Sequence, residues 1–361
     1  MIANRLVTAV LLCGLTSTFV HAQGFAGLGT DASGFAIPEV GHDLTFPRDH
    51  GAHPEYRIEW WYLTANLETP DGKALGVQWT LFRSALRPKA AEEWSSDQVW
   101  MGHAALTEPD QHHVAERLGR GGTGQAGVSS TPFQAWIDDW EMTSPDDTLN
   151  RLSLSARGDT FSYDLELGTD APLVLHGEGG YSLKSQSGQA SYYYAQPSYS
   201  VTGTVEIDGV SQPVVGNAWL DREWSSQPLD GDQTGWDWFS LRFDTGEKLM
   251  GFILRSETGD YSSGTWISPD NRATPLEPGM FRATPIELTR VSDRDVPTTW
   301  RVEVADHKVD VAVKALNPMA WMATQFPYWE GPVAVSGSHK GRGYMEMTGY
   351  GDARSISPSN R

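Results

Sequence analysis

The apolar residues of this chain fall in short runs that alternate with polar residues and stop at Gly, Pro, Asn or Asp. Alternation with a period of two is typical of antiparallel strands, whereas helical periodicity is scarce here. Three segments predict hairpins: 59–84, 152–167 and 199–220. The last of these is expected to turn at Asp208-Gly209, a sequence that favours a tight two-residue turn. The pattern therefore predicts an all-β protein.

A weak internal repeat runs through the chain. Segment 60–84 resembles 236–256, because each has an aromatic pair, a Gly turn and a strand ending in Arg-Ser. Two further pairs of segments follow in the same order: 102–111 with 264–272, and 176–194 with 329–347. The recurrence predicts two similar β domains that arose by duplication.

The repeat also predicts where the domains end. A polar, turn-rich stretch separates the two halves, so we expect a linker at 226–235 between domains at 46–225 and 236–352. Residues 23–45 would form an N-terminal linker. Many short strands in each half favour antiparallel barrels or sandwiches, with lipocalin-like barrels as the leading choice.

The first residues predict a cleaved signal peptide. A short basic region, an apolar run too short to span a membrane and the small residues before position 23 place the cleavage after Ala22, with 1–22 removed. The only cysteine, Cys13, lies in this leader, so the mature chain has neither disulfides nor thiolate chemistry. We expect a periplasmic or secreted protein.

Charge narrows the choice of partners. The chain carries 46 acidic and 27 basic residues, a formal net charge of −19, and the predicted cleavage removes Arg5 and no acid. Such an acidic protein disfavours nucleic acid and anionic lipid surfaces as partners. The composition says nothing of the oligomeric state.

The segment "NAWLDREWSSQP" (217–228) is the main candidate for chemistry. On a strand its side chains alternate between faces, so Trp219, Asp221 and Glu223 share one face, and Leu220, Arg222 and Trp224 share the other. Two carboxylates at i and i+2 lie roughly 6.5–7 Å apart. They form either an ion-paired structural cluster or the acid of an active site, and burial beside indoles would favour the second.

Glu59 offers the same choice. It opens an aromatic strand on which Trp61 shares its face, and desolvation there would raise its pKa and keep a proton available. The alternative is a carboxylate in solvent or paired with an arginine. His50 and His53 precede it in a loop, where they hydrogen-bond or line a pocket mouth rather than bind metal, because no helix presents both rings together. We expect no metal and no cofactor.

Other candidates lie elsewhere in the chain. His103 sits in the middle of a predicted strand, and three consecutive tyrosines put Tyr193 on one face or the other. Trp236 and Trp238 open the second half and would meet the junction, while "YWEG" (328–331) adds another aromatic–acid pair. Core packing is the alternative for each. The chain has no G-x-S-x-G elbow, phosphate-binding loop or H-E-x-x-H motif.

Several long motifs resemble one family. These are "EWWYLTANL", "HGEGGYSLKSQSGQASYYYAQP", "GNAWLDREWSS" followed by "GWDWFSLRFD", and "YWEG…GRGYMEMTGYG". Together they resemble the carotenoid 1,2-hydratase-like proteins, also called AttH-type or predicted secreted hydrolases, from about Phe46 to Gly351. The resemblance implies two lipocalin-like antiparallel β domains packed side by side. Related cyclases of similar architecture bind their substrates between the two domains.

The resemblance also implies a chemistry. Family hydratases add water across a carotenoid double bond, which needs a proton donor, a stabilised carbocation and a positioned water. Residues of this chain supply each role: Asp221 or Glu59 as the acid, Trp219 or Trp238 as faces for a cation, and Tyr193 or His103 to hold water.

The sequence thus supports three functions. The leading one is a protein that binds a hydrophobic, lipid-like or isoprenoid-like molecule and catalyses its acid-assisted hydration or isomerisation. The second is a periplasmic lipid carrier without turnover, serving a membrane export system. The third is a carbohydrate-active hydrolase. The catalytic candidates are Glu59, Asp221, Glu223, His103 and Tyr193, and the ligand-binding candidates are His53, Trp61, Trp219, Trp224, Trp236 and Trp238.

Overall fold

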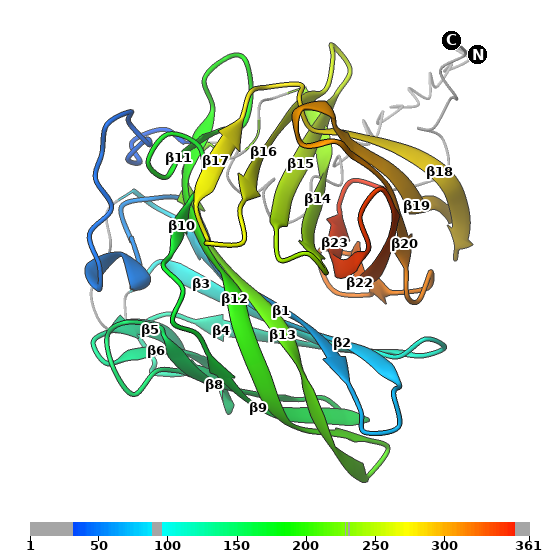
Figure 1. The fold of residues 1–361 in the computed structure, drawn as a ribbon. Helices are drawn as coiled ribbons and strands as arrows, with labels where there is room; N and C mark the ends of the chain where they lie inside the picture. Colours follow the sequence, from blue (N-terminus) through cyan, green and yellow to red (C-terminus); the bar gives the residue numbers. More distant parts are fainter. Residues whose placement is uncertain (1–31, 89–95, 228, 230–231, 351–361) are drawn as a thin grey trace, which may run out of the picture.

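The chain folds almost entirely into antiparallel strands, which form two curled sheets (Figure 1). The computed structural model describes residues 32–88, 96–227, 229 and 232–350. In this part the helical segments are two short 3₁₀ turns, η2 (Arg48–His50) and η4 (Ala305–His307), and no helix is long and apolar enough to cross a membrane. The predicted all-β class is confirmed. The predicted leader lies outside the described residues.

The first sheet runs in the order β4-β3-β2-β1-β13-β12-β9-β8-β7-β6-β5, and β10 and β11 pair with β12 outside this path. Its strands are β1 (Ile58–Glu68), β2 (Ala74–Ala85), β3 (Gln98–Thr107), β4 (His112–Arg120), β5 (Ala126–Ser130), β6 (Phe133–Ile137), β7 (Trp140–Thr143), β8 (Arg151–Arg157), β9 (Phe161–Gly168), β10 (Val174–Leu175), β11 (Tyr181–Leu183), β12 (Ala190–Ile207) and β13 (Val210–Ser225).

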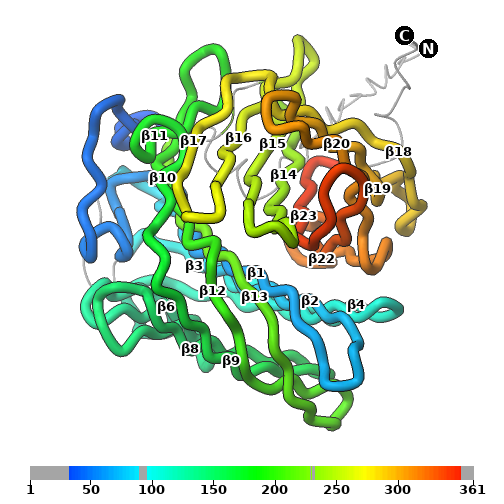
Figure 2. The backbone as a smooth tube through the Cα atoms, viewed as in Figure 1, coloured from blue at the N-terminus to red at the C-terminus, as the bar shows by residue number. Residues whose placement is uncertain are grey.

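The second sheet runs in the order β17-β16-β15-β14-β23-β22-β20-β19-β18, and β21 pairs with β22. Its strands are β14 (Gln233–Phe243), β15 (Lys248–Ser256), β16 (Tyr261–Ile267), β17 (Ala273–Leu276), β18 (Arg282–Val291), β19 (Arg294–Val304), β20 (Val309–Ala315), β21 (Trp321–Met322), β22 (Tyr328–Gly337) and β23 (Gly341–Met347). Figure 2 shows the chain passing from the first sheet, in blue to green, to the second, in yellow-green to red.

The predicted hairpins form as expected. β1 pairs with β2, β8 with β9, and β12 with β13. The turn between the last two strands lies at Asp208 and Gly209, whose φ angles of 49° and 80° are the left-handed values that such a turn requires. The change of sheet falls between Ser225 and Gln233. The division into domains stays a prediction.

The two sheets share an order of pairing. In the first sheet β2-β1-β13-β12 lie side by side, and in the second β15-β14-β23-β22 do so. This agrees with the predicted correspondence of 60–84 and 236–256. The correspondence of 176–194 with 329–347 is wrong, because 329–347 covers most of β22 and β23, whose counterparts in pairing order are β12 and β13.

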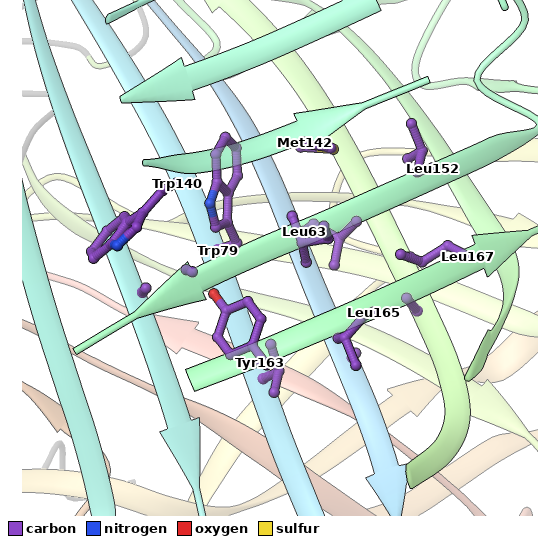
Figure 3. Close-up of a cluster of buried hydrophobic side chains, with 14 of the residues drawn as sticks. Leu63, Trp79, Trp140, Met142, Leu152, Tyr163, Leu165 and Leu167 are labelled. Carbon is purple, nitrogen blue, oxygen red and sulfur yellow. The ribbon is translucent and has the colours of Figure 1, made fainter. Parts of the chain in front are cut away.

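Each sheet curls around an apolar core of its own. Inward side chains alternate along the strands of the first sheet, and Figure 3 shows Trp79, Trp140 and Tyr163 gathered between them. A second cluster fills the inside of the other sheet, with Phe239, Trp300 and others fully buried. Burial of such large rings is the main source of stability for each curled sheet.

The outer faces of the two sheets meet. Strand β2 contacts β22, and β1 contacts β23. We call the space between these faces the seam; on the first sheet Trp60 and Tyr62 face it, and on the second Trp236 and Trp238 do. A third apolar cluster holds the seam together, with the rings of Tyr62 and Trp238 packed edge to face at 5.3 Å. The seam positions the candidate site.

Candidate functional site

A cavity opens in the seam. Together with its mouth it holds about 720 Å³ free of protein atoms. Both sheets and the segment that joins them contribute to its wall. Its lining residues are Trp60, Tyr62, Phe82, Lys184, Tyr193, Asp221, Glu223, Leu229, Trp236, Trp238, Phe252, Leu254 and Glu346. Nine of these thirteen side chains are aromatic or aliphatic, so the cavity suits an apolar molecule with a few polar contacts.

Strand alternation brings the lining residues together. On β13 the side chains of Asp221 and Glu223 point into the cavity, whereas Arg222 between them points to the opposite face. Tyr62 on β1 is the cross-strand partner of Asp221, so the two share a face. The predicted separation of the two faces of this segment is confirmed.

Asp221 is the central polar group of the cavity wall. Its side chain is 2% exposed. The Trp219 indole N–H donates to its Oδ1 at 2.7 Å, and the Tyr193 hydroxyl donates to its Oδ2 at 2.9 Å. The Trp238 indole N–H in turn donates to the Tyr193 oxygen at 3.1 Å. One polar chain therefore joins the two sheets through a carboxyl group.

Burial decides the charge of Asp221. Loss of water raises its pKa well above the ordinary value, and nearby Glu223 raises it further. The bonds from Trp219 and Tyr193 and the charge of Lys184 act in the opposite direction but do not outweigh burial. Burial therefore favours the protonated form of Asp221 over the carboxylate at the cavity surface.

Glu223 differs from Asp221 because a cation touches it. The Lys184 ammonium lies 2.8 Å from its carboxylate, and the Ser191 hydroxyl donates to it. The same ammonium lies 4.3 Å from the ring centre of Phe252. Lys184 and Glu223 thus form an ion pair in one wall of the cavity. Lys184 could not be singled out from the sequence, because the segment around it shows no clear strand pattern that would indicate which side of a sheet its side chain occupies.

Two further acids lie on the second sheet. Glu346 lines the cavity and accepts from the Trp236 indole N–H at 2.6 Å, and burial raises its pKa to about 7. Glu330 lies behind the wall, 1% exposed, and burial followed by the charge of Glu346 raises its pKa well above the ordinary value. Tyr62 and Tyr328 lower the pKa of Glu330 without reversing this. Glu346 is not among the residues predicted from the sequence, and Glu330 was predicted only as the acid of the aromatic–acid pair in "YWEG".

Glu59 faces away from the cavity. It is fully buried, and its carboxylate is paired with Arg83 and, at 2.7 Å, with Arg222. Burial alone would raise its pKa, but the two guanidinium groups together with His53 lower it below the ordinary value. Of the two environments predicted for Glu59, the pairing with arginine is the one that forms, and the pKa rise expected from desolvation alone does not occur, because two arginines converge on this carboxylate. This ionised group opposes the predicted role of proton donor.

His53, Trp61 and Trp224 belong to the same buried network as Glu59. The His53 ring stacks on Trp224 with ring centres 4.0 Å apart, and the Arg222 guanidinium lies 3.8 Å from the ring centre of Trp61. None of these three residues lines the cavity. Of the six predicted ligand-binding residues, Trp236 and Trp238 line it, and Trp219 holds Asp221.

His103 lies one layer behind the cavity. It is fully buried on β3, where its Nδ1 is 3.0 Å from the Tyr328 hydroxyl and its Nε2 is 3.2 Å from Glu116. Burial lowers its pKa, so the ring is neutral at neutral pH. Its ring packs edge to face with Phe82, a lining residue, at 5.1 Å. His103 therefore supports the wall rather than contacting a ligand. In the described ranges, no three His, Asp or Glu side chains are arranged to hold a metal ion.

Comparison with known proteins shows the family. The AttH-like family model matches residues 38–350. The chain belongs to the AttH-like family. A proposed AttH of Nitrosomonas europaea is similar over 88% of this chain and all of its own, with 34% identity and a TM-score of 0.80. The AttH-type resemblance predicted from the sequence is confirmed. A search of curated proteins finds no match.

More distant solved structures share the fold. Kievitone hydratase from Nectria haematococca is 14% identical, with a TM-score of 0.67 over 89% of this chain and 96% of its own. CghA, solved with Sch210972, is 10% identical, with a TM-score of 0.54 over 82% of this chain and 88% of its own. At these identities the likeness concerns the arrangement of the two sheets.

Proposed function

We propose that this AttH-like protein binds a hydrophobic, unsaturated molecule in the seam cavity and catalyses its hydration or isomerisation by acid. The observation that carries the proposal is Asp221: a buried carboxyl group whose pKa burial raises, held by Trp219 and Tyr193 in the wall of an aromatic cavity. A neutral carboxylic acid facing an apolar ligand is the group that protonation of a carbon–carbon double bond requires.

In either reaction Asp221 donates one proton and regains one, so the acid is regenerated in each cycle. The Asp221 proton moves to one alkene carbon, the π electrons form the new C–H bond, and a carbocation remains on the neighbouring carbon. In hydration, water adds to the cation and its proton returns to the Asp221 carboxylate. In isomerisation, an adjacent C–H bond gives its proton to the carboxylate, and its electrons form the shifted double bond.

The surroundings of Asp221 suit both charges that form. The Trp219 N–H and Tyr193 O–H bonds strengthen when Asp221 becomes a carboxylate, so they stabilise the charge that develops during proton transfer. The faces of Trp60, Trp236 and Trp238 line the same cavity, and each indole stabilises a nearby cation by about 0.5–2 kcal/mol.

The relatives give this proposal its second support. One protein with the same fold is named as the hydratase of kievitone, and another has been solved with the organic molecule Sch210972. The fold thus accommodates organic ligands and, in one case, addition of water. An exported location, proposed from the leader before position 23, would let the chain meet lipids of the cell envelope.

A carrier without turnover is the second candidate, favoured by the apolar lining of the cavity. In that case Asp221 would only bind a polar group of the cargo. The third prediction, a carbohydrate-active hydrolase, has less support because most of the lining is apolar, whereas sugars need many hydrogen-bonding side chains.

A comparison of bound molecules tests the proposal. Wild type, Asp221→Asn and the exposed control Asp164→Asn are purified from the periplasm, and their ligands are identified by native mass spectrometry. We expect Asp221→Asn to retain an unsaturated substrate, which wild type and the control convert to a product heavier by one water or to an isomer. Identical, unconverted ligands in all three proteins would establish the carrier instead.

A further inference from the structure

Three cations stand in a row across the second sheet. Arg242 on β14 is the cross-strand partner of Lys248 on β15 and also of Arg342 on β23. Directly opposed residues share a face of the sheet, and like charges in such positions destabilise it. This cost is unexpected in a chain with 46 acidic and 27 basic residues, since acids are abundant enough to separate the cations.

No carboxylate compensates the row. Within the described part of the chain, none lies within ion-pair distance of Arg242, Lys248 or Arg342. Lys248 is 3% exposed, and burial followed by the charge of Arg242 lowers its pKa to about 8. Burial and then the charge of Arg342 lower the pKa of Arg242. Lys248 and Arg242 are therefore each destabilised by the charge of a neighbouring cation.

Polar groups of both sheets surround the row. Arg242 lines two adjoining hollows, a small one with Arg342, and a cleft that holds about 910 Å³ together with its mouth. The Lys248 ammonium donates to Asn271 at 3.1 Å, while the Arg242 Nη1 is buried without a hydrogen-bond partner. The other polar lining residues are Thr64, Asn66, Arg151, Thr169, Asp170, Ser198, Ser200, Asn217 and Ser240. Asp170 is thus the one carboxylate among the described lining residues.

We propose that Arg242, Arg342 and Lys248 form a binding site for an oxyanion, a phosphate or carboxylate group, at the end of the seam opposite the acids. An oxyanion between the three cations would remove their mutual repulsion and accept the unpartnered N–H of Arg242. Guanidinium groups bind phosphate and carboxylate in pairs of parallel hydrogen bonds, which gives such a site both affinity and selectivity.

The site lies on the same face as the cavity. Trp238 and Arg242 are four residues apart on β14, hence roughly 13 Å along the strand. The small hollow also contacts Trp219, whose N–H holds Asp221. The oxyanion is therefore either a free anion or the head group of an amphiphile whose apolar part follows the seam. The inference stands whether or not Asp221 catalyses a reaction.

Binding of two probes tests the site. Inorganic phosphate and dodecyl phosphate are titrated into the full chain by calorimetry, with chloride at matched ionic strength, and thermal stability is followed in parallel. Arg242→Gln and the more exposed Arg342→Gln are compared with Lys314→Gln, which removes an exposed lysine from β20 of the same sheet outside the cleft.

We expect each arginine variant to weaken binding at least about tenfold, the effect of losing one charge-assisted hydrogen bond. Lys314→Gln should bind like wild type, and the arginine variants should melt no lower than wild type without ligand. If both probes bind with equal affinity, the natural ligand is a free anion. If dodecyl phosphate alone binds, the site holds the head group of an amphiphile. If neither probe binds, or the arginine variants bind like wild type, the site does not exist.

Discussion

Two carboxyl groups show how neighbours set charge at the scale of a residue. Asp221 and Glu59 are both buried beside indole rings. Glu59 is ionised because two guanidinium groups contact it, whereas Asp221 receives only an indole N–H and a phenol O–H, and burial raises its pKa. Removal from water is therefore insufficient to make a proton donor; the absence of a contacting cation matters equally.

Glu346 should make stability depend on pH. Its pKa is about 7 in the folded protein and near 4.5 when unfolded, so between these values the folded state binds more protons. Its contribution is fully present below about pH 4.5 and is lost as pH rises to 7. Between pH 5 and pH 8 we expect the free energy of unfolding of Glu346→Gln to fall by roughly 2 kcal/mol less than that of wild type. Urea unfolding across this pH range measures the difference.

The exposed substitution Glu166→Gln on β9 is the control for that experiment, since its side chain is free of the seam. An unchanged pH profile in Glu346→Gln would mean that Glu346 titrates normally in the folded state.

Among the strands, β1 and β13 contribute side chains to a different site on each of their two faces. One face supplies Tyr62 and Asp221 to the cavity. The other holds the loop before β1, because the Trp61 indole N–H donates to the carbonyl group of His50 at 2.9 Å and Arg222 donates to the carbonyl group of Gly51. The alternation of Asp, Arg and Glu in "LDRE" therefore serves two sites, one on each side of the sheet.

Glu59 should matter for stability and not for catalysis. Glu59→Gln leaves two buried guanidinium groups without their carboxylate, which costs about 3–5 kcal/mol in comparable pairs. We expect that loss in urea unfolding, whereas the exposed control Glu206→Gln should change stability little. The folded fraction of Glu59→Gln should still convert its ligand like wild type. Loss of turnover with retained stability would restore Glu59 as a catalytic acid.

In the whole molecule, the shape of the seam cavity depends on how closely the two sheets approach. Gly76 on β2 permits the contact, because a Cβ there would lie 2.5 Å from Pro332 Cγ and 2.9 Å from the Tyr344 hydroxyl. The Trp238–Tyr193 hydrogen bond and the cavity itself both cross this seam. A shift of one sheet would therefore alter the hydrogen bonds and the cavity around Asp221, even if Asp221 itself did not move.

Gly76→Ala should reveal this dependence. We expect a loss of about 1–3 kcal/mol from overpacking, together with weaker ligand retention as the sheets separate. Thermal unfolding and native mass spectrometry measure the two effects. Gly168→Ala is the matched control, because a Cβ there meets only Arg151 Nη1, at 3.8 Å. Equal behaviour of the two variants would show that the seam tolerates the extra methyl group.

The strands of this protein and the faces of their side chains could be predicted from the sequence alone. Alternation and turn residues predicted the hairpins and the faces of Asp221 and Arg222, because a strand's side chains follow a local period of two. The long motifs of the family predicted its membership, as the match over 38–350 shows.

Which charged groups contact one another depends on the folding of distant segments onto each other. Glu59 pairs with Arg83, 24 residues away, and with Arg222, 163 residues away, while Asp221 meets Trp238 through Tyr193. Lys184 and Glu346 join the cavity, and Arg242 joins Lys248 and Arg342, through strand order and sheet packing. Protonation and charge depend on distances between segments remote in the chain, and a local pattern carries no information about those distances.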